Sequence, residues 1–242
     1  MKLNDECERK LHFGNNQNDS EGFEVLTEDT NIIPFRVFEA FAGYGSQHLA
    51  LQELADLYSN FNFKVVGISE IDETAIKAYK ILHGDGVFNY GDISTINWKE
   101  VPNFNVFTYS FPCQDISLNG NQQGFEKGSN TRSSLLWECK RAIELKKPKY
   151  LLMENVKNIT CKKYKKSLDE WISVLSGLGY TSFNEIMNAS DFGIPQHRER
   201  FIMISILGKS FFEFPKSQKI TENLNELLEK NVKESFYLKK VA

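Results

Sequence analysis

The sequence predicts an α/β fold in which a mostly parallel β-sheet carries helices on both faces. Short apolar runs alternate with stretches of helical periodicity along most of the 242 residues. That order is typical of parallel sheets with crossover helices. No internal repeat and no Pro-rich linker interrupts it. The length suits one sizeable α/β domain or a large fragment of a bigger protein, and a core of that size needs no disulfide or metal.

The expected elements follow one another from Phe35. The strands are expected in the apolar runs at residues 35–43, 64–70, 105–111, 149–155 and 200–206. The helices are expected at 46–58, 72–82, 133–145 and 167–180, where apolar residues recur at helical spacing. Asp72 is expected to cap the second helix, and Ser133 or Ser134 the third, because their side-chain oxygens accept from free N–H groups.

The distribution of charge divides the chain into an acidic start and a near-neutral body. Residues 1–34 hold 8 acidic and 3 basic side chains, within a net charge of −3 for the whole chain. This polar segment shows little periodicity, and it is interpreted as a flexible N-terminal extension. Residues 35–208 are expected to form the main folded domain. The strong basic run Lys157–Lys166 has two interpretations, a solvated loop or a contact with phosphates.

The cysteines and apolar runs indicate the compartment. The four cysteines form no CxxC pair, no stretch is typical of a signal peptide, and no apolar run is long enough to span a bilayer. We therefore expect free thiols in a reducing, cytoplasmic compartment. The histidines and cysteines show no metal-ligand spacing, so no metal site is predicted.

Polar residues after the first strands predict a nucleoside pocket. Gly43 and Gly45 make a turn after the first strand, Glu70 ends the second, and Asp92 precedes the aliphatic Ile93. A carboxylate at the end of the second strand accepts ribose hydroxyls in nucleotide-binding sheets. An acid beside an aliphatic side chain suits an adenine ring. Because no P-loop is present, this pattern favours S-adenosyl-L-methionine over NAD or ATP.

A single thiol, Cys113, follows Pro112 at the end of an apolar run, with Gln114 directly behind it. A structural core cysteine needs neither a proline brace nor polar neighbours. Proline fixes the backbone before the thiol, and a thiolate is a strong nucleophile. The pattern therefore predicts a nucleophile at the tip of a strand.

The motifs FAGYG, FPCQ, ENV and QHRER come in the order and spacing of the C5-cytosine DNA methyltransferases, which the chain resembles from about Arg36 to Ile206. The stretch SFPCQDISLNGNQQGFEKG, followed by TRSSLLWE, resembles the active-site loop of that family and its next helix. The resemblance implies a Rossmann-like S-adenosylmethionine-dependent methyltransferase domain. It also implies transfer of a methyl group to C5 of cytosine in DNA. The reaction would take place on a base flipped out of the duplex.

The family's roles carry over onto four catalytic positions. Cys113 corresponds to the nucleophile that adds to cytosine C6. Glu154, in ENV, corresponds to the glutamate at N3 and the exocyclic amine, a role that needs a raised pKa, which burial can provide. Arg200 corresponds to the arginine that binds O2 of the cytosine, and Arg198 supports the site.

The resemblance also implies cofactor and DNA contacts. The expected cofactor residues, beyond those that the pattern itself predicts, are Phe41, Ala42, Ile71, Ser110 and Leu135. The expected DNA contacts are Gln114, Ser117 and Gln123.

The chain departs from the family after the last strand. Residues 209–242 resemble the lead-in to a target-recognition domain, and neither that domain nor the final catalytic segment follows. We therefore expect either a truncated chain or the larger chain of a split enzyme. Its partners would then be double-stranded DNA and a second polypeptide carrying the missing parts, within a prokaryotic restriction-modification or related system. The alternatives are a tRNA cytosine-C5 methyltransferase and a non-catalytic subunit that retains the fold.

Overall fold

The computed structural model describes residues 34–117, 120, 122–217, 225, 228–229 and 232–236. Six strands form one sheet in the order β2-β1-β3-β4-β6-β5. The strands are β1 (Phe35–Ala40), β2 (Phe63–Ser69), β3 (Val106–Tyr109), β4 (Tyr150–Val156), β5 (Tyr180–Asn188) and β6 (Glu199–Leu207). Neighbours among the first four strands are parallel, whereas β6 runs antiparallel to β4 and β5. The sheet is therefore mostly parallel, as predicted.

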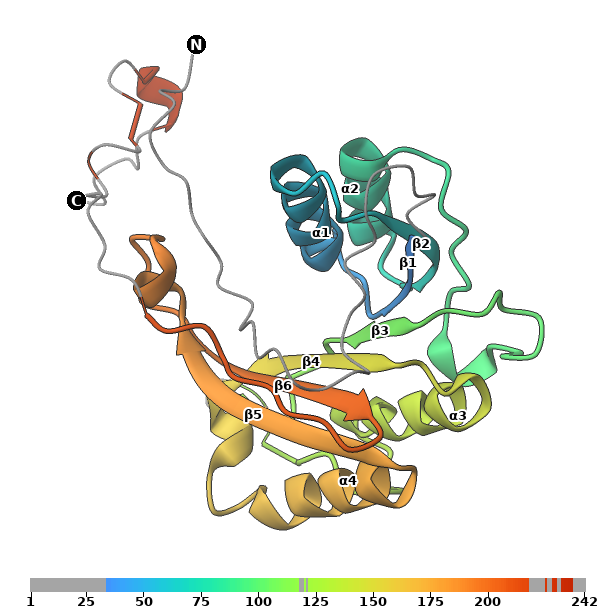
Figure 1. The fold of residues 1–242 in the computed structure, drawn as a ribbon. Coiled ribbons are helices and arrows are strands. Elements are labelled where there is room, and N and C mark those ends of the chain that lie inside the picture. Colours follow the sequence, from blue (N-terminus) through green and yellow to red (C-terminus); the bar gives the residue numbers. More distant parts are fainter. Residues whose placement is uncertain are drawn as a thin grey trace, which may run out of the picture. The chain divides into compact units, whose positions relative to one another are not determined.

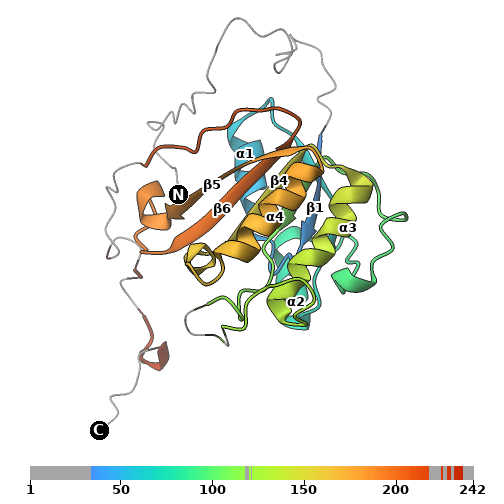
Figure 2. The ribbon, with the colours of Figure 1, turned by 90° about the horizontal axis from the view of Figure 1, so that it is seen from below.

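Helices cover both faces of the sheet. The helices are α1 (Ser46–Leu57), α2 (Glu73–His83), α3 (Leu136–Lys146) and α4 (Lys165–Gly177). The helices α1 and α2 lie over the β1 and β2 end on one face (Figure 1). On the opposite face α3 and α4 lie side by side across the sheet (Figure 2). None of the helices in the described part of the chain is long and apolar enough to cross a membrane.

The structure confirms one of the two expected helix caps and contradicts the other. The Asp72 side chain accepts from the Ala75 N–H at 2.8 Å, which confirms the predicted cap of α2. The expected cap at Ser133 or Ser134 is wrong. These serines lie inside a 3₁₀ turn, η2 (Arg132–Leu135), which Thr131 caps by accepting from Ser134 N–H. The following helix α3 therefore begins only at Leu136.

The main core lies between the sheet and the α3–α4 layer. Phe38, Phe107 and Met153 on the sheet and Trp171 on α4 are all 0 % exposed. The indole Nε1 of Trp171 donates to the Tyr109 hydroxyl at 3.3 Å, which satisfies a buried donor. Removing a buried aromatic side chain of this kind typically costs about 3–5 kcal/mol of stability. This core fixes the ends of the strands that carry the polar residues described below.

The other face of the sheet is only partly covered. No helix of the described chain lies over β4, β6 and β5 on that face (Figure 1). The apolar side chains there are partly exposed: Leu152 on β4, Ile202 and Ile204 on β6, and Phe183 on β5. The ring of Phe212 packs on Phe183, with 6.1 Å between centroids. Sheets with parallel strands normally bury both faces, so this open face is available for a further layer.

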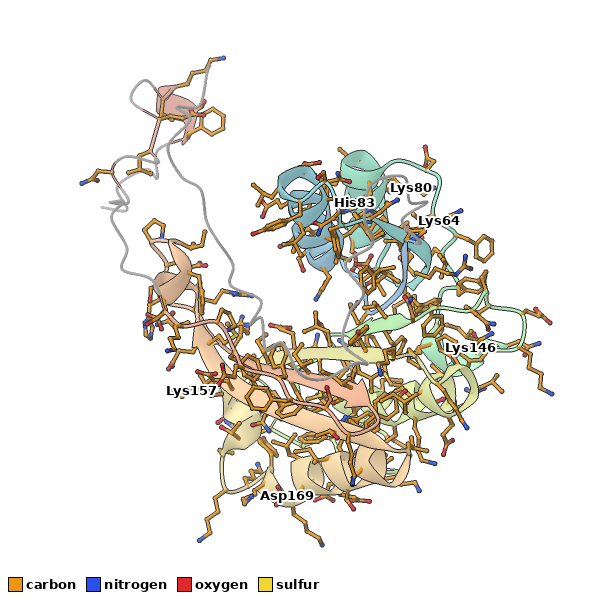
Figure 3. All side chains as sticks on the ribbon, in the orientation of Figure 1. Lys64, Lys80, His83, Lys146, Lys157 and Asp169 are labelled. Atoms are coloured by element: carbon orange, nitrogen blue, oxygen red, sulfur yellow. The ribbon has the colours of Figure 1, made fainter. Side chains whose placement is uncertain are left out.

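A buried carboxyl group lies under the β1 end, where α1 and α2 meet the sheet. Glu39 is 0 % exposed, and its Oε2 accepts from the Tyr79 hydroxyl at 2.8 Å. The Tyr79 hydroxyl also pairs with His48 Nδ1, and His48 stacks on His83 at 4.0 Å between α1 and α2 (Figure 3). Burial raises the pKa of Glu39 to about 7. Burial, assisted by His83, lowers the pKa of His48 to about 4.

We expect Glu39→Gln to gain stability over the wild-type chain as pH rises. Ionising the buried carboxyl is unfavourable, so the folded chain holds this proton from the ordinary pKa of 4.5 up to about 7. The protonated group stabilises the fold below pH 4.5, and that contribution is lost as pH rises through 7. The variant should gain about 2–3 kcal/mol relative to wild type between pH 5 and 8. Urea unfolding at both pH values measures this difference. The exposed Glu185→Gln serves as the control, and parallel pH profiles for Glu39→Gln and wild type would contradict the expectation.

Candidate active site

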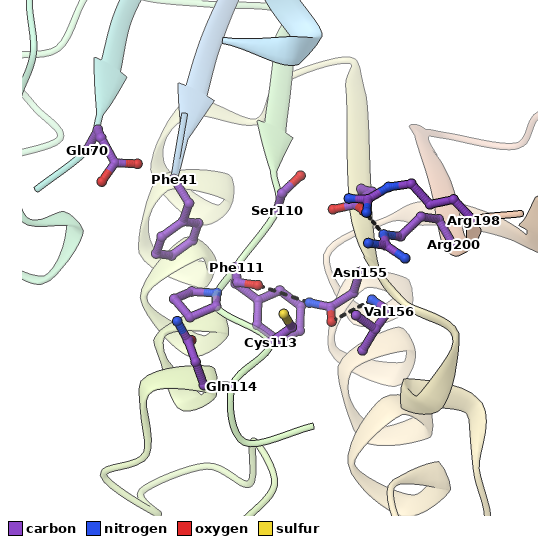
Figure 4. Close-up of a pocket in the computed structure, with 12 residues that line it drawn as sticks. Phe41, Glu70, Ser110, Phe111, Cys113, Gln114, Asn155, Val156, Arg198 and Arg200 are labelled. Carbon is purple, nitrogen blue, oxygen red and sulfur yellow. Dashed lines mark hydrogen bonds and ion pairs between the residues drawn. The ribbon is translucent and has the colours of Figure 1, made fainter. Parts of the chain in front are cut away.

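One cavity of about 300 Å³ brings the four predicted catalytic residues together with three of the predicted cofactor residues at the carboxyl ends of the parallel strands. Phe41 follows β1, Glu70 follows β2, and Ser110 follows β3 (Figure 4). The remaining lining residues are Phe111, Pro112, Cys113, Gln114, Glu154, Asn155, Val156, Arg198 and Arg200. This edge of the sheet is where open α/β sheets bind ligands. Its volume lies at the lower end for small-molecule pockets.

Cys113 sits in the loop after β3, and its neighbours hold that loop to β4. The thiol is free and half-buried. The Cys113 carbonyl accepts from the Ile116 and Ser117 N–H groups at 3.0 and 2.8 Å, so Cys113 begins a helical turn. On β4, buried Asn155 donates its side-chain N–H to the Phe111 carbonyl at 3.0 Å. A single buried amide therefore ties the loop of Cys113 to the strand that carries Glu154.

Glu154 and Arg200 form an ion pair on the opposite wall of the cavity. The Arg200 Nε lies 3.0 Å from Glu154 Oε1, and both side chains are about a quarter to a third exposed, at 25 % and 30 %. Arg200 also donates to the Glu199 carbonyl at 2.8 Å, which orients its guanidinium. Arg198, just before β6, is exposed and points into the same cavity (Figure 4). The cavity thus places a thiol, a carboxyl group and two guanidinium groups around one space.

Phe41, Glu70 and Ser110 line the part of the cavity where cofactor contacts are predicted, here called the cofactor edge. At this edge Glu70 holds the glycine turn in place. Its Oε2 accepts from the Gly43 N–H at 2.8 Å, and its Oε1 accepts from the N–H groups of Ile71 and Asp72 at 2.8 Å each. Gly43 has φ +57° and open space where a Cβ would stand. At Gly45, with φ +83°, a Cβ would lie 2.7 Å from the Tyr79 ring. Gly43 is therefore favoured for its conformation, and Gly45 both for its conformation and for close packing.

The other predicted cofactor residues differ in what they expose. Ile71 is 68 % exposed beside Glu70, whereas Ile93 is 2 % exposed and Ala42 4 % exposed inside the core. Leu135, in η2, is partly buried against that core. Asp92 caps a 3₁₀ turn, η1 (Ile93–Thr95), by accepting from Ser94 N–H at 2.9 Å. On this geometry Ile71 offers the larger apolar surface to a ring, because little of Ile93 is accessible.

We expect Glu70→Ala to weaken binding of S-adenosyl-L-methionine by about 1–3 kcal/mol, the cost of losing charge-assisted hydrogen bonds. The substitution removes the predicted ribose acceptor and the brace of the Gly43 N–H at once. Isothermal calorimetry on the active assembly measures the loss. Asp85→Ala, which removes an exposed carboxylate that pairs with Lys80 away from the cavity, is the matched control. Equal affinity for wild type and Glu70→Ala would mean that another group holds the ribose.

A second, more open cavity of about 740 Å³ adjoins the first. Arg198 and Arg200 line both cavities, and Ser117 and Lys157 line the second. Lys157 pairs with Glu199 at 2.7 Å near the start of β6 (Figure 3). Gln114 lines the first cavity, and Gln123 is exposed. All three predicted DNA-contacting residues are therefore accessible, and their contacts with DNA remain a prediction.

Two contacts at the site escaped the sequence pattern. Gln47, in the first turn of α1, donates its side-chain N–H to the Ser110 hydroxyl at 2.8 Å, which joins the glycine turn to the loop of Cys113. Asn158, in η3 (Lys157–Thr160), donates to the Ile116 carbonyl at 2.6 Å. Neither residue type is diagnostic by itself, and only the approach of segments distant in sequence gives these amides a role.

A family model described as "C-5 cytosine-specific DNA methylase" matches residues 35–241. The chain belongs to this family. The match confirms the predicted family and enzyme class. Among similar proteins, the Type II methyltransferase M2.ScrFI of Lactococcus lactis subsp. cremoris is 42 % identical over 84 % of this chain and 70 % of its own length. The orphan methyltransferase M.SssI of Spiroplasma monobiae is 33 % identical over 82 % of this chain and 66 % of its own length. The Type II methyltransferase M.HhaI of Haemophilus parahaemolyticus is 33 % identical over 84 % of this chain and 60 % of its own length.

Solved structures agree with the fold of this family member. The Entamoeba histolytica methyltransferase EhMeth has a TM-score of 0.67 at 23 % identity, covering 86 % of this chain and 63 % of its own. The Schizosaccharomyces pombe ("S. pombe") Dnmt2 methyltransferase has a TM-score of 0.63 at 23 % identity, with coverages of 84 % and 62 %. At these identities the likeness supports the methyltransferase fold.

Proposed function

We propose that this chain transfers a methyl group from S-adenosyl-L-methionine to C5 of cytosine in duplex DNA, through a covalent bond between Cys113 and C6. The observation that carries the proposal is the shared cavity. Cys113, Glu154 and Arg200 line it together with Phe41, Glu70 and Ser110 of the cofactor edge. The family match over residues 35–241 supports the same chemistry.

The side chains divide the reaction among them. The Cys113 thiolate adds to C6, which converts the unreactive ring into an enamine with a nucleophilic C5. C5 then takes the methyl group from the sulfonium, and loss of the C5 proton with cleavage of the C6–S bond restores the ring and the free thiolate. In its protonated form, once the ion pair with Arg200 opens, Glu154 donates a hydrogen bond to N3, and Arg200 compensates the negative charge on O2, so that both favour the addition. The ion pair between Glu154 and Arg200 holds both side chains on one wall of the cavity before the cytosine binds. Pro112 and the turn after Cys113 fix the direction of the thiol.

The residues at the cofactor edge fit an adenosyl sulfonium compound, which supplies the methyl group as an electrophile. The first turn of α1 has no side-chain cap and no acidic residue. Its free N–H groups therefore suit the carboxylate of the methionine part of the cofactor. The carboxylate of Glu70 suits ribose hydroxyls, and exposed Ile71 suits an apolar ring face. No lysine-bearing phosphate loop occurs at this edge.

The test of the proposal is transfer of labelled methyl groups to polymer substrates by the active assembly. We expect labelling of duplex DNA at cytosine C5 and none of transfer RNA. Labelling of RNA alone would select the alternative branch with the same chemistry. The absence of labelling on both polymers, with the cofactor bound, would favour a non-catalytic subunit.

We propose further that the open face of the sheet binds a second polypeptide that completes the enzyme. Leu152, Ile202 and Ile204 leave part of their apolar surface exposed there, and the chain spans 70 %, 66 % and 60 % of the three relatives named above. Sequence reading also requires a surface that contacts base edges in the major groove. The second polypeptide would supply that surface together with a layer over the sheet.

The chain alone is expected to be inactive, and co-expression with its partner is expected to restore transfer. The candidates for that partner are the polypeptides encoded beside this one. Ile204→Asp, which places a charge on the open face, should abolish the rescue, whereas Ser173→Asp, which places the same charge on exposed α4 at the opposite face, should not. Sequence-specific turnover by the isolated chain at an ordinary rate would refute the split arrangement.

The names of the relatives support a proposal for the biological setting. Two of the three are named as Type II methyltransferases, of Lactococcus and Haemophilus. A role in a prokaryotic restriction-modification system, in the cytoplasm or nucleoid where the DNA lies, agrees with these names.

A further inference from the structure

Side chains from surrounding elements hold the backbone of the loop that carries Cys113. Four carbonyl groups of this loop each accept a hydrogen bond from a side chain of another segment. The pairs are Phe111 with Asn155, Pro112 with Ser133, Asp115 with the Tyr164 hydroxyl, and Ile116 with Asn158. The loop is therefore positioned by the elements around it and not by local backbone bonds alone.

Ser133 differs from the other three because its one hydroxyl bridges both sides of the nucleophile. Its Oγ donates to the carbonyl of Pro112, directly before Cys113, at 2.6 Å. The same oxygen accepts from the N–H of Asp115, two residues after Cys113, at 3.3 Å. The Ser133 N–H in turn donates to Asp115 Oδ2 at 3.1 Å. These three bonds close a ring around the thiol-bearing residue.

The surroundings bury Ser133 and Asp115 and exclude water from their hydrogen bonds. Ser133 is 0 % exposed and Asp115 is 3 % exposed, so water competes little for their hydrogen bonds. Ser133 belongs to η2, which continues directly into α3, and the first residue of that helix, Leu136, is 0 % exposed in the core. The position of α3 on the sheet is thereby transmitted to the loop of Cys113.

We propose that Asp115 and Ser133 form a clamp that orients the Cys113 thiol toward the base, which makes both of them positioning residues for methyl transfer. The clamp rests on the proposed role of Cys113 as nucleophile. Neither Asp115 nor Ser133 lines the cavity, so both act through the loop. Misplacing a reacting group by about 1 Å costs about 100-fold in rate. The contacts of Glu70 with the glycine turn are separate from the clamp.

The first test measures single-turnover methyl transfer by the active assembly at saturating DNA and S-adenosyl-L-methionine. Ser133→Ala and Asp115→Ala are expected to lower this rate by about 10- to 100-fold, with the KM for the cofactor within twofold of wild type. Asp115→Asn keeps an acceptor for the Ser133 N–H and is expected to recover most of the rate. Ser134→Ala is the matched control, because its hydroxyl donates only within its own turn, to the Thr131 carbonyl at 2.6 Å.

The second readout is alkylation of Cys113 by iodoacetamide on the full chain, followed by mass spectrometry. This small reagent needs no particular orientation, so its rate should stay within threefold of wild type in all variants, with half-buried Cys161 as the internal reference. A large loss of transfer with unchanged alkylation is the signature of positioning. Alkylation that falls in parallel with transfer would overturn the clamp and indicate a change of the thiol itself.

The outcomes separate this inference from the proposed function. If the wild-type assembly transfers no methyl group, the proposed function fails. If it is active and Ser133→Ala keeps more than half of its rate, the clamp is refuted. If Ser133→Ala does not fold, as judged by thermal melting, the comparison of Asp115→Asn with Asp115→Ala decides, and equal rates in that pair refute the clamp.

Discussion

Cys113→Ser is expected to abolish methyl transfer while leaving cofactor binding intact. The serine hydroxyl is too weakly acidic to add to C6 without a strong base, and the lining of the cavity offers no histidine for that task. Losing the nucleophile of a covalent enzyme costs about three orders of magnitude in rate or more. Transfer of labelled methyl groups to DNA measures the loss in the active assembly.

Cofactor affinity provides the control for this substitution. Gly43 and Glu70 contact each other and not the thiol, so S-adenosyl-L-methionine should bind Cys113→Ser within twofold of wild type. A variant that retained more than a few per cent of wild-type activity would show that another group is the nucleophile. A loss of affinity equal to the loss of rate would instead indicate a damaged pocket.

Glu154→Ala is expected to lower the rate by about 10²–10⁴-fold, the range for removal of a general acid. The substitution removes the donor to N3 and leaves Arg200 without its partner at 3.0 Å. Glu154→Gln keeps a hydrogen-bond donor but cannot transfer a proton, so it should lie between wild type and Glu154→Ala. Single-turnover kinetics at saturating substrate measures all three proteins.

Glu170→Gln on α4 is the matched control, because this carboxylate is exposed, lies away from the open face of the sheet and does not line the cavity. Equal rates for Glu154→Gln and Glu154→Ala would contradict a hydrogen bond to N3. A wild-type rate in Glu154→Ala would contradict any role of this carboxyl group in the reaction.

The strands that the sequence predicted are those whose side chains are mostly buried. In β1 and β3 the apolar runs follow directly from burial on both faces, as in Val37, Phe38 and Phe107, all 0 % exposed. The strand β5 has no such run, because it lies at the sheet edge and only Tyr180 among its residues is buried. Its pairing with β6 across the whole of its length replaces the missing apolar signal.

The helix caps show a second limit of sequence reasoning. Thr131, Ser133 and Ser134 are all good caps by residue type, and the sequence pattern alone does not choose among them. The choice depends on the loop of Cys113. Ser133 is drawn away to the Pro112 carbonyl, and Thr131 is left to cap the turn.

The candidate site was predictable where motifs carry the chemistry. Cys113, Glu154, Arg198 and Arg200 were singled out by type and order, and they line one cavity. Their surroundings depend on tertiary structure. No pattern indicated that Glu70 would brace Gly43, or that buried Asn155 would tie two walls of the site together.

The segments at both ends bear on two further predictions. The expected N-terminal extension, residues 1–34, lies outside the described residues except for its last position, and so does half of the expected lead-in at 209–242. The domain boundaries at 35 and 208 therefore stay predictions, although β1 begins at Phe35 and β6 ends at Leu207.

Covalent trapping on DNA containing 5-fluorocytosine tests the central claim most directly. Fluorine at C5 cannot leave as a proton does, so the bond between the enzyme and C6 persists after methyl transfer. With the active assembly and S-adenosyl-L-methionine, we expect a stable protein–DNA adduct whose peptide map places the base on Cys113, and no adduct with Cys113→Ser. Methylation of ordinary cytosine DNA without any trapped adduct, or an adduct on another residue, would contradict the account.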